Sequence, residues 1–358
     1  MVVSPTVTSP QIMQSAMTRV PQLVFDNLEA MGLAPKANQK IADCIDANTQ
    51  GGNLLRGRTV IDTAWILRGH SLSPAEADDL GKLGSLVELL NAAYLIWDDI
   101  MDGSSTRRGK PCWYRRESIG MDAVNDGCLL RSSIYVIIKN GFRDHPSYLE
   151  LTELFAEACL QTELGQHCDA LASTGSLEEF IWKQYGFITA KKTAYYTMYL
   201  PLTIPLFYLG LATPERLAEI YDISMKMGYV FQARDDFLDV YGDPNVTGKI
   251  GTDIQDHKCA WPAIEAMARC DDNQRMVLIE NYGKKDPVNV LKVKAIFDEI
   301  NLPQLFGDWD AKMVAELGPM TEKITDAVVR ESVMAFMSKY FKDTLRHLPS
   351  TSGKLEWC

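Results

Sequence analysis

Two aspartate-rich segments of the form D-D-x-x-D constrain this chain more than any other feature. They are residues 98–102 (DDIMD) and 235–239 (DDFLD), and each directly follows an apolar stretch. If both stretches are helical, the first and last aspartates of each motif lie on one helix face, about 5–6 Å apart. Carboxylates this close at the end of an apolar helix repel one another unless a cation lies between them. The pattern therefore predicts two buried helices whose ends bind Mg²⁺, because hard oxygen ligands suit hard cations.

A diphosphate is the expected third partner at such sites, because Mg²⁺ also takes phosphate oxygens. The alternative is an acidic run on a solvated helix face, which would explain one such motif well. Two copies, both preceded by apolar sequence and both followed by basic residues, favour metal binding. The motifs lie far apart in the sequence and must converge to act together, which a helical bundle with a central cavity allows.

Helical periodicity dominates the rest of the chain, and alternating strand patterns are scarce. Residues 73–76 (SPAE) predict the start of the helix that leads to the first motif, with Ser73 as N-cap, Pro74 in the first turn and Glu76 completing a capping box. Residues 213–215 (TPE) open another helix in the same way. Further helices are predicted over residues 150–167 and 290–300.

These patterns predict an all-α protein built as a single large helical bundle with a central cavity. No linker rich in Pro, Gly or Ser divides the chain, so the bundle is expected over residues 21–350. Residues 1–20 are predicted to form a flexible N-terminal tail, and residues 351–358 a C-terminal tail.

Composition excludes several classes of partner. The 358 residues carry a formal net charge of −11, which does not suit nucleic acid. No apolar run reaches the roughly 18 residues that a membrane span needs. The eight cysteines form no C-x-x-C pair, which is typical of reduced thiols in a cytoplasmic protein. The first twenty residues lack acids but hold one arginine only, so mitochondrial targeting is the weaker alternative to a cytoplasmic location.

Basic residues follow both motifs. Arg107 and Arg108 come after the first, and a guanidinium binds phosphate oxygens through two parallel hydrogen bonds. Lys249 and Lys258 come after the second, in and beyond a glycine-rich loop. That loop is not a P-loop, because Ile250 stands where the motif requires Ser or Thr. These four cations are placed to reach a metal-bound diphosphate.

With these motifs the chain resembles the trans-isoprenyl diphosphate synthases, most closely the farnesyl diphosphate synthases of animals. The resemblance covers about residues 40–345. It is carried by DDIMD-x4-RRG-x-x-CWY (residues 98–114), by KTA-x-Y (192–196) and by the segment from FQ-x-x-DD to KC-x-W (231–261). It implies an isoprenoid synthase fold, a homodimer, and three Mg²⁺ ions that hold an allylic diphosphate.

The resemblance also implies roles for individual residues. The implied metal ligands are Asp98, Asp102 and Asp235, supported by Asp99, Asp236 and Asp239. The implied diphosphate-binding residues are Arg107, Lys192 and Lys249, joined by Arg56, Arg108 and Lys258. Thr193 and Gln232 would line the reacting end of the chain. The aromatic rings that could stabilise a carbocation are Tyr94, Phe187, Phe231 and Trp97, although core packing is the alternative for each.

The sequence departs from this family where isopentenyl diphosphate would bind. The family pattern G-G-K-x-N-R-G reads GGNLLRG at residues 51–57, so Asn53 and Leu55 replace a lysine and an asparagine. Asn91 stands in place of a glutamine, and the basic C-terminal tail is replaced by GKLEWC. Arg56 and Arg108 are what remains of that site.

These departures favour a terpene synthase over a coupling enzyme. We expect a magnesium-dependent, diphosphate-releasing lyase that ionises farnesyl diphosphate to a sesquiterpene hydrocarbon or alcohol, like the insect terpene synthases derived from prenyl diphosphate synthases. The alternative is a farnesyl or geranyl diphosphate synthase that couples isopentenyl diphosphate to an allylic diphosphate. A third hypothesis, a non-catalytic subunit of a prenyl synthase, does not account for six intact aspartates.

Overall fold

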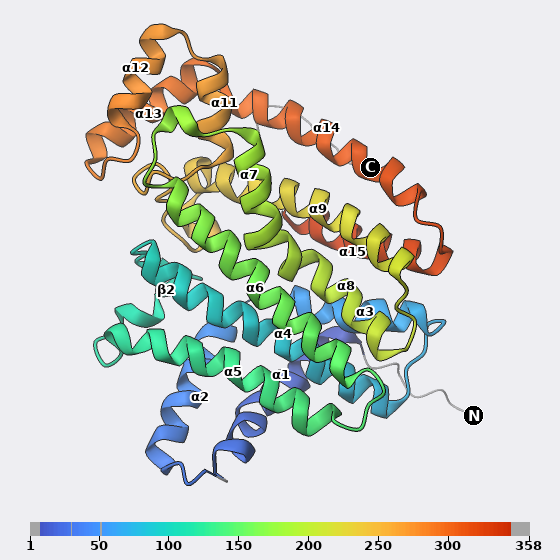
Figure 1. Cartoon of the computed structure of the whole chain (residues 1–358). Helices are drawn as coiled ribbons and strands as arrows, with labels where there is room; N and C mark the ends of the chain where they lie inside the picture. The colour runs from blue at the N-terminus through green and yellow to red at the C-terminus, as the bar shows by residue number, and fades with distance from the viewer. Residues whose placement is uncertain (1–7, 30, 51, 345–358) are drawn as a thin grey trace. The chain divides into compact units, whose positions relative to one another are not determined.

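Most of the described residues are helical, as predicted (Figure 1). The computed structural model describes residues 8–29, 31–50 and 52–344. In this part of the chain the only sheet is an antiparallel hairpin of β1 (Thr106–Arg107) and β2 (Lys110–Pro111). No helix among these residues is long and apolar enough to cross a membrane.

The helices follow one another with short connections. In chain order they are α1 (Ser9–Glu29), α2 (Pro35–Thr49), α3 (Leu55–Leu67), α4 (Pro74–Met101), α5 (Ala123–Phe142), α6 (Tyr148–Ala172), α7 (Trp182–Ile188), α8 (Leu200–Tyr208), α9 (Pro214–Tyr241), α10 (Pro244–Thr247), α11 (Trp261–Arg269), α12 (Asp272–Asn281), α13 (Pro287–Glu299), α14 (Leu302–Glu322) and α15 (Ala327–Thr344). Three 3-10 turns are η1 (Trp113–Arg115), η2 (Gly120–Asp122) and η3 (Leu177–Glu179), and a π-helix, η4 (Thr189–Tyr199), joins α7 to α8.

The described residues divide into two compact units of discontinuous sequence. The first combines the chain up to residue 159 with residues 196–221 and 324–336. The second combines residues 160–195 and 222–323 with the chain from residue 337. The single domain predicted over residues 21–350 stays a prediction.

Helix α4 is the centre of the first unit. It packs against α1, α2, α3, α5 and α8. It is apolar around most of its circumference, and residues such as Leu80, Leu86 and Leu90 are completely buried, which is typical of a central helix. Its predicted capping box is confirmed: the Ser73 hydroxyl accepts from the Glu76 N–H at 3.2 Å, and the Glu76 carboxylate accepts from the Ser73 N–H at 2.8 Å.

Helix α1 corrects the predicted N-terminal tail. Residues 9–20 are helical rather than flexible, and Met13 and Val20 have no exposed surface. The segment is rich in Ser and Thr, which suggests a tail, but its apolar residues recur at helical spacing. These apolar residues lie on a helix that packs on α3 and α4. Residues 1–7 and 351–358, the remainder of the two predicted tails, lie outside the described residues.

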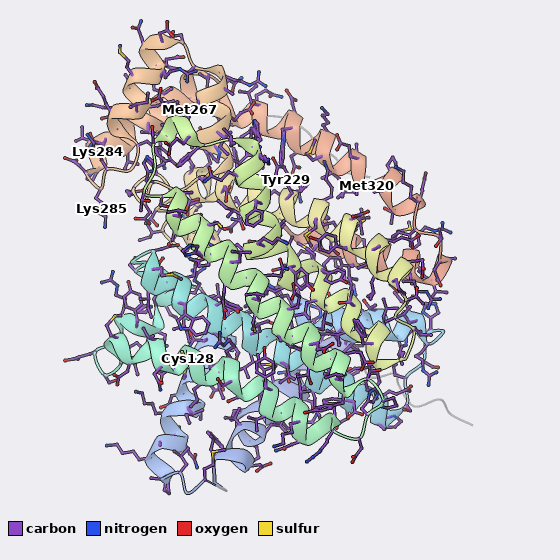
Figure 2. All side chains as sticks on the ribbon, in the orientation of Figure 1. Cys128, Tyr229, Met267, Lys284, Lys285 and Met320 are labelled. Atoms are coloured by element: carbon purple, nitrogen blue, oxygen red, sulfur yellow. The ribbon has the colours of Figure 1, made fainter. Side chains whose placement is uncertain are left out.

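The second unit has its own aromatic core. Phe237, inside the second aspartate motif, stacks on Phe306 of α14 with ring centroids 4.1 Å apart, and Trp261 of α11 meets the same Phe306 ring at 5.0 Å. Helices α12 and α13 form a hairpin beside this core. The predicted turn between them exposes Lys284 and Lys285 (Figure 2).

Candidate active site

The first aspartate motif ends helix α4. Asp102 is the residue after the helix, and its N–H donates to the Asp98 carbonyl at 2.9 Å. The Asp98 side chain is about one quarter exposed, whereas the Asp99 side chain is nearly completely buried. The helix therefore presents Asp98 outward and turns Asp99 into the protein.

Arg107 returns to this motif from the β-hairpin. Its Nε and Nη2 donate to Asp99 Oδ1 at 3.0 and 2.6 Å, and Nη2 lies 3.4 Å from Asp98 Oδ2. The return depends on the turn, where Arg108 and Gly109 both have left-handed backbones (φ 53° and 71°), which glycine adopts without strain. The structure thus brings the predicted arginine and the first motif together, with Asp99 in a supporting position.

Arg108 points toward the end of helix α2. Its Nη1 donates to the carbonyls of Asn48 and Gln50 at 2.9 and 3.0 Å. Desolvation lowers its pKa. Together with Arg107, Lys110 and Arg116 it lines a pocket of the first unit. Four cations around one pocket make this end of α4 suitable for an anionic ligand.

Arg56 is held by two residues that follow the KTA motif. Its guanidinium donates to the Thr197 hydroxyl at 3.1 Å and lies 5.0 Å from the centre of the Tyr196 ring. The Tyr196 hydroxyl in turn donates to Asn91 Oδ1 at 3.2 Å. Asn91, which departs from the family pattern, therefore keeps a hydrogen-bonded role beside Arg56. Asn53 is exposed, and Leu55 is the first residue of α3.

Tyr94 and Trp97 lie one turn apart on α4, and their rings meet edge-on with centroids 5.4 Å apart. Tyr94 is buried, donates its hydroxyl proton to the Cys159 carbonyl at 3.1 Å and has its ring 6.1 Å from Tyr196. Trp97 packs on Gly127 of α5 and donates to the Val124 carbonyl at 3.1 Å. Trp97 therefore contributes to helix packing, and a carbocation role for either ring stays a prediction.

Asp236 of the second motif is a buried hydrogen-bond acceptor. Its Oδ2 accepts from the Tyr185 hydroxyl at 2.8 Å and from the Trp261 N–H at 2.9 Å, and its Oδ1 accepts from Gln232 Nε2 at 2.8 Å. Desolvation raises its pKa to about 7, although these hydrogen bonds oppose the shift. Such an environment suits a residue that supports the motif, which is the role expected for Asp236.

Asp235 is the outward member of the second motif, whereas the Asp239 side chain is only 8% exposed, and Lys249 lies beside both. The Asp235 side chain is 46% exposed, and Lys249 Nζ lies 3.0 Å from its Oδ2 and 3.9 Å from Asp239 Oδ2. The loop reaches α9 because Gly251 has no side chain: a Cβ there would lie 1.9 Å from the Asp239 carbonyl oxygen. The structure thus places Lys249 beside the second motif, and its contact with a diphosphate stays a prediction.

Thr193 and Gln232 form a direct hydrogen bond of 2.6 Å between η4 and α9. Two glycines allow the helices to approach this closely. A Cβ on Gly165 of α6 would lie 2.1 Å from the Lys192 nitrogen, and one on Gly228 of α9 would lie 2.1 Å from the Ala194 Cβ. Because π-helical turns are rare and concentrate at functional sites, the position of Lys192 and Thr193 on η4 fits a catalytic segment.

Asp169 is a site residue that the sequence analysis missed. Its Oδ2 accepts from Lys192 Nζ at 2.7 Å and from Lys258 Nζ at 2.9 Å. Desolvation would raise the pKa of this buried carboxyl group, but the two ammonium groups lower it. The signal in the sequence was the pair of Gly165 and Asp169, one helical turn apart on the same face of α6.

Phe231 and Phe187, the other two aromatic residues predicted to stabilise a carbocation, have different neighbours. Phe231 packs edge-on against Tyr340 of α15, with ring centroids 5.7 Å apart. Phe187 is 42% exposed, and the Lys191 ammonium lies 5.9 Å from its ring centre. Their predicted contact with a carbocation stays a prediction.

The donor set of both motifs suits Mg²⁺. Among the described residues, no three His, Cys, Asp or Glu side chains form a metal site by themselves. Mg²⁺ does not require one, because it usually binds one or two carboxylates and completes its shell with water and phosphate oxygens. Asp98 and Asp102 offer such a pair one helical turn apart, and Asp235 offers a half-exposed carboxylate at the second motif.

Comparisons with known proteins agree with this arrangement. The sequence model of the family described as "Polyprenyl synthetase" matches residues 38–300. The farnesyl pyrophosphate synthase of Schizosaccharomyces pombe is 40% identical over 324 residues, which cover 89% of this chain and 93% of that protein. That of Saccharomyces cerevisiae is 38% identical, over 90% and 95% of the two chains. The Trypanosoma brucei farnesyl diphosphate synthase complexed with risedronate superposes with a TM-score of 0.88 and 30% identity, over 94% of this chain and 99% of that one.

These relatives correct the predicted activity. The expected diphosphate-releasing terpene synthase, a sesquiterpene-forming lyase, is wrong: the similar proteins are named for farnesyl diphosphate synthesis, and the similarity spans nearly their full length. This favours the alternative of chain elongation. Magnesium dependence and an allylic diphosphate substrate agree with this class of enzyme, and the all-α isoprenoid synthase fold is confirmed. From its motifs, its fold and its relatives, the chain belongs to the polyprenyl synthetase family.

Proposed function

We propose that this protein is a prenyltransferase that couples isopentenyl diphosphate to an allylic diphosphate, with farnesyl diphosphate as the product. The observation that carries the proposal is the identity of about 40% with farnesyl pyrophosphate synthases over most of the chain. It is supported by the carboxylates and cations described above, because both substrates of such a reaction are diphosphates.

The reaction breaks one C–O bond and forms one C–C bond. The allylic diphosphate leaves with the bonding electron pair, the double bond of isopentenyl diphosphate attacks the resulting allylic cation, and loss of a proton from the isopentenyl unit restores a double bond. Bound Mg²⁺ would supply electrophilic stabilisation of the departing diphosphate. Arg107, Lys192 and Lys249 would stabilise the same developing negative charge through charge-assisted hydrogen bonds.

In this proposal Asp98, Asp102 and Asp235 are the metal ligands, and three Mg²⁺ ions bind for each allylic diphosphate. Asp99 and Asp236 support the ligands, because Asp99 is paired with Arg107 and Asp236 with Tyr185. With only these three carboxylates as ligands, room is left for water and phosphate oxygens, as Mg²⁺ requires.

The second diphosphate would bind to Arg56 and Arg108. Both remain cations beside partners that hold them: Thr197 and Tyr196 for Arg56, and the end of α2 for Arg108. Replacement of a lysine by Asn53 removes one charge-assisted contact, which is worth about 1.5–3 kcal/mol. We therefore expect weak binding of isopentenyl diphosphate rather than its loss.

The test is a coupling assay with purified protein, Mg²⁺, dimethylallyl or geranyl diphosphate and radiolabelled isopentenyl diphosphate. We expect labelled farnesyl diphosphate. Asp98→Ala and Asp235→Ala should each reduce turnover to background, whereas Asp144→Ala, an exposed aspartate on the loop after α5, should not. Absence of labelled prenyl product in the wild-type protein would refute the proposal.

We also propose that two copies of the chain form a homodimer through α6. Leu149, Leu160, Leu164 and Leu171 are 41–62% exposed, and their spacing places them on one helical face. An exposed apolar stripe of this kind is typical of a protein interface. Sedimentation velocity should show a dimer that Leu160→Asp with Leu164→Asp converts to monomer; a monomeric wild-type protein would refute it.

We propose a cytoplasmic location for the reaction. Cys44 and Cys259 are free thiols, and burial raises the pKa of both to about 12, which keeps them unreactive. Fluorescence imaging of the tagged full-length chain should show a diffuse cytoplasmic signal, and a mitochondrial signal would contradict it.

A further inference from the structure

Asp169 lies at a point where two ammonium groups meet. Lys192 comes from η4 and Lys258 from the loop before α11, and both bond to the same oxygen, Oδ2, at 2.7 and 2.9 Å. The Asp169 side chain is 7% exposed, compared with 22% for Lys192 and 11% for Lys258. The carboxylate therefore lies behind the two lysines, which are more accessible.

Two ammonium groups on one oxygen are close enough to repel each other strongly in a buried site. The carboxylate offsets this repulsion and keeps the pair in place. A diphosphate carries several anionic oxygens and can bind both groups at once. The pair is thus a preorganised dication, and its spacing depends on the anion behind it.

The backbones that carry the lysines are held as well. Gly165, one turn before Asp169 on α6, lets the Lys192 backbone approach so closely that any Cβ would collide with it. On the other side, the Tyr282 hydroxyl donates to the Lys258 carbonyl at 2.8 Å. Both lysines are therefore fixed by their backbone and by their side-chain nitrogen, so that Asp169 sets where the two ammonium groups lie.

We propose that Asp169 is a positioning residue that holds Lys192 and Lys258 together as a paired-ammonium site for the substrate diphosphate. The choice of ligand rests on the proposed function. The carboxylate itself does not touch the substrate; it acts through the two lysines.

Asp169→Asn tests the inference, because asparagine keeps the size of the side chain and removes its charge. The probe is inorganic pyrophosphate with Mg²⁺, and its affinity is measured by calorimetry. Asp310→Asn is the matched control, since Asp310 is equally buried in the second unit and pairs with Arg234 at 2.6 and 2.8 Å. Circular dichroism and urea unfolding check that each variant is folded.

We expect Asp169→Asn to weaken pyrophosphate binding about tenfold to a hundredfold, as the loss of a charge-assisted contact predicts. Asp310→Asn should change it less than about twofold. In a Lys192→Met, Lys258→Met background, adding Asp169→Asn should have no further effect, because residues that act through one another are not additive.

Two results would overturn the inference. Unchanged or tighter pyrophosphate binding by Asp169→Asn would mean that the carboxylate competes with the anion rather than positioning the lysines. If Asp169→Asn weakened pyrophosphate binding just as much in the absence of both lysines, Asp169 would affect binding without acting through them. The assay needs no prenyl substrate, so failure of chain elongation by the wild-type protein would refute the proposed function without deciding this test.

Discussion

Gly228 controls how closely α9 approaches η4, and its replacement by alanine gives the sharpest test of the site geometry. The new Cβ would lie 2.1 Å from the Ala194 Cβ and 2.5 Å from the Ala194 Cα, whereas ordinary contacts begin at 3.4 Å. The helices would have to separate by more than about 1 Å, since neither obstacle is the end of a flexible side chain.

This separation would break the contact between Thr193 and Gln232. Gln232 lies one turn after Gly228 on the same face of α9, and Thr193 is next to Ala194. Their hydrogen bond of 2.6 Å would lengthen beyond hydrogen-bonding range. We expect Gly228→Ala to cost about 1–3 kcal/mol in unfolding free energy, and a displacement of this size to lower kcat about a hundredfold.

Gly186→Ala is the matched control. Gly186 also lies inside a helix of the second unit, but its nearest outside atom would be 3.9 Å from a new Cβ. Alanine there should leave activity unchanged and stabilise the helix by roughly 0.5–1 kcal/mol. Urea unfolding and the coupling assay are measured on both variants. A folded Gly228→Ala protein with kcat within twofold of wild type would refute the reasoning.

Three further predictions concern stability and substrate binding. Burial raises the pKa of Asp236 to about 7 from an ordinary 3.8, so between these pH values the folded state holds a proton that the unfolded chain releases. As the pH rises through this range in EDTA, the unfolding free energy of the wild type should therefore fall by up to ~1.4 kcal/mol per pH unit relative to Asp236→Asn. Unfolding free energies from urea titrations that change with pH in parallel for the two proteins would contradict this. Gly57→Ala should cost about 1–3 kcal/mol in unfolding free energy, because its Cβ would lie 2.5 Å from Met13 Cε and 2.8 Å from the Gly84 carbonyl; an unchanged urea midpoint would refute this. Arg56→Gln should raise KM for isopentenyl diphosphate about tenfold or more and leave KM for the allylic substrate within about twofold; equal changes in both would exclude a selective role.

The helices were predictable because their signals are local. The Ser73 capping box, the Pro at the start of α9 and the apolar period of α6 depend on residues within one or two turns, and the structure has each of them. Helix α1 was not predicted because its Ser and Thr content is typical of a disordered tail. Its burial depends on packing against α3 and α4, which follow later in the sequence.

The substitutions at the predicted isopentenyl diphosphate site are too few to determine the activity. Asn53, Leu55 and Asn91 suggested a lost substrate site, yet Asn91 still accepts a hydrogen bond from Tyr196, and Arg56 and Arg108 remain cations. A binding site is the sum of its contacts, so losing one or two weakens it without removing the chemistry of the whole chain.

The sequence by itself determined the helical class, the family and the supply of carboxylates and cations for magnesium and diphosphate. Only the tertiary structure decided how these groups are used. Asp235 and Asp236 are neighbours in one motif, yet one is half exposed and the other is buried among three donors. Asp169 and Lys258 are 89 positions apart and share one hydrogen bond. Burial and charge pairing depend on which surfaces pack together, and the spacing of residues along a single helix does not determine that.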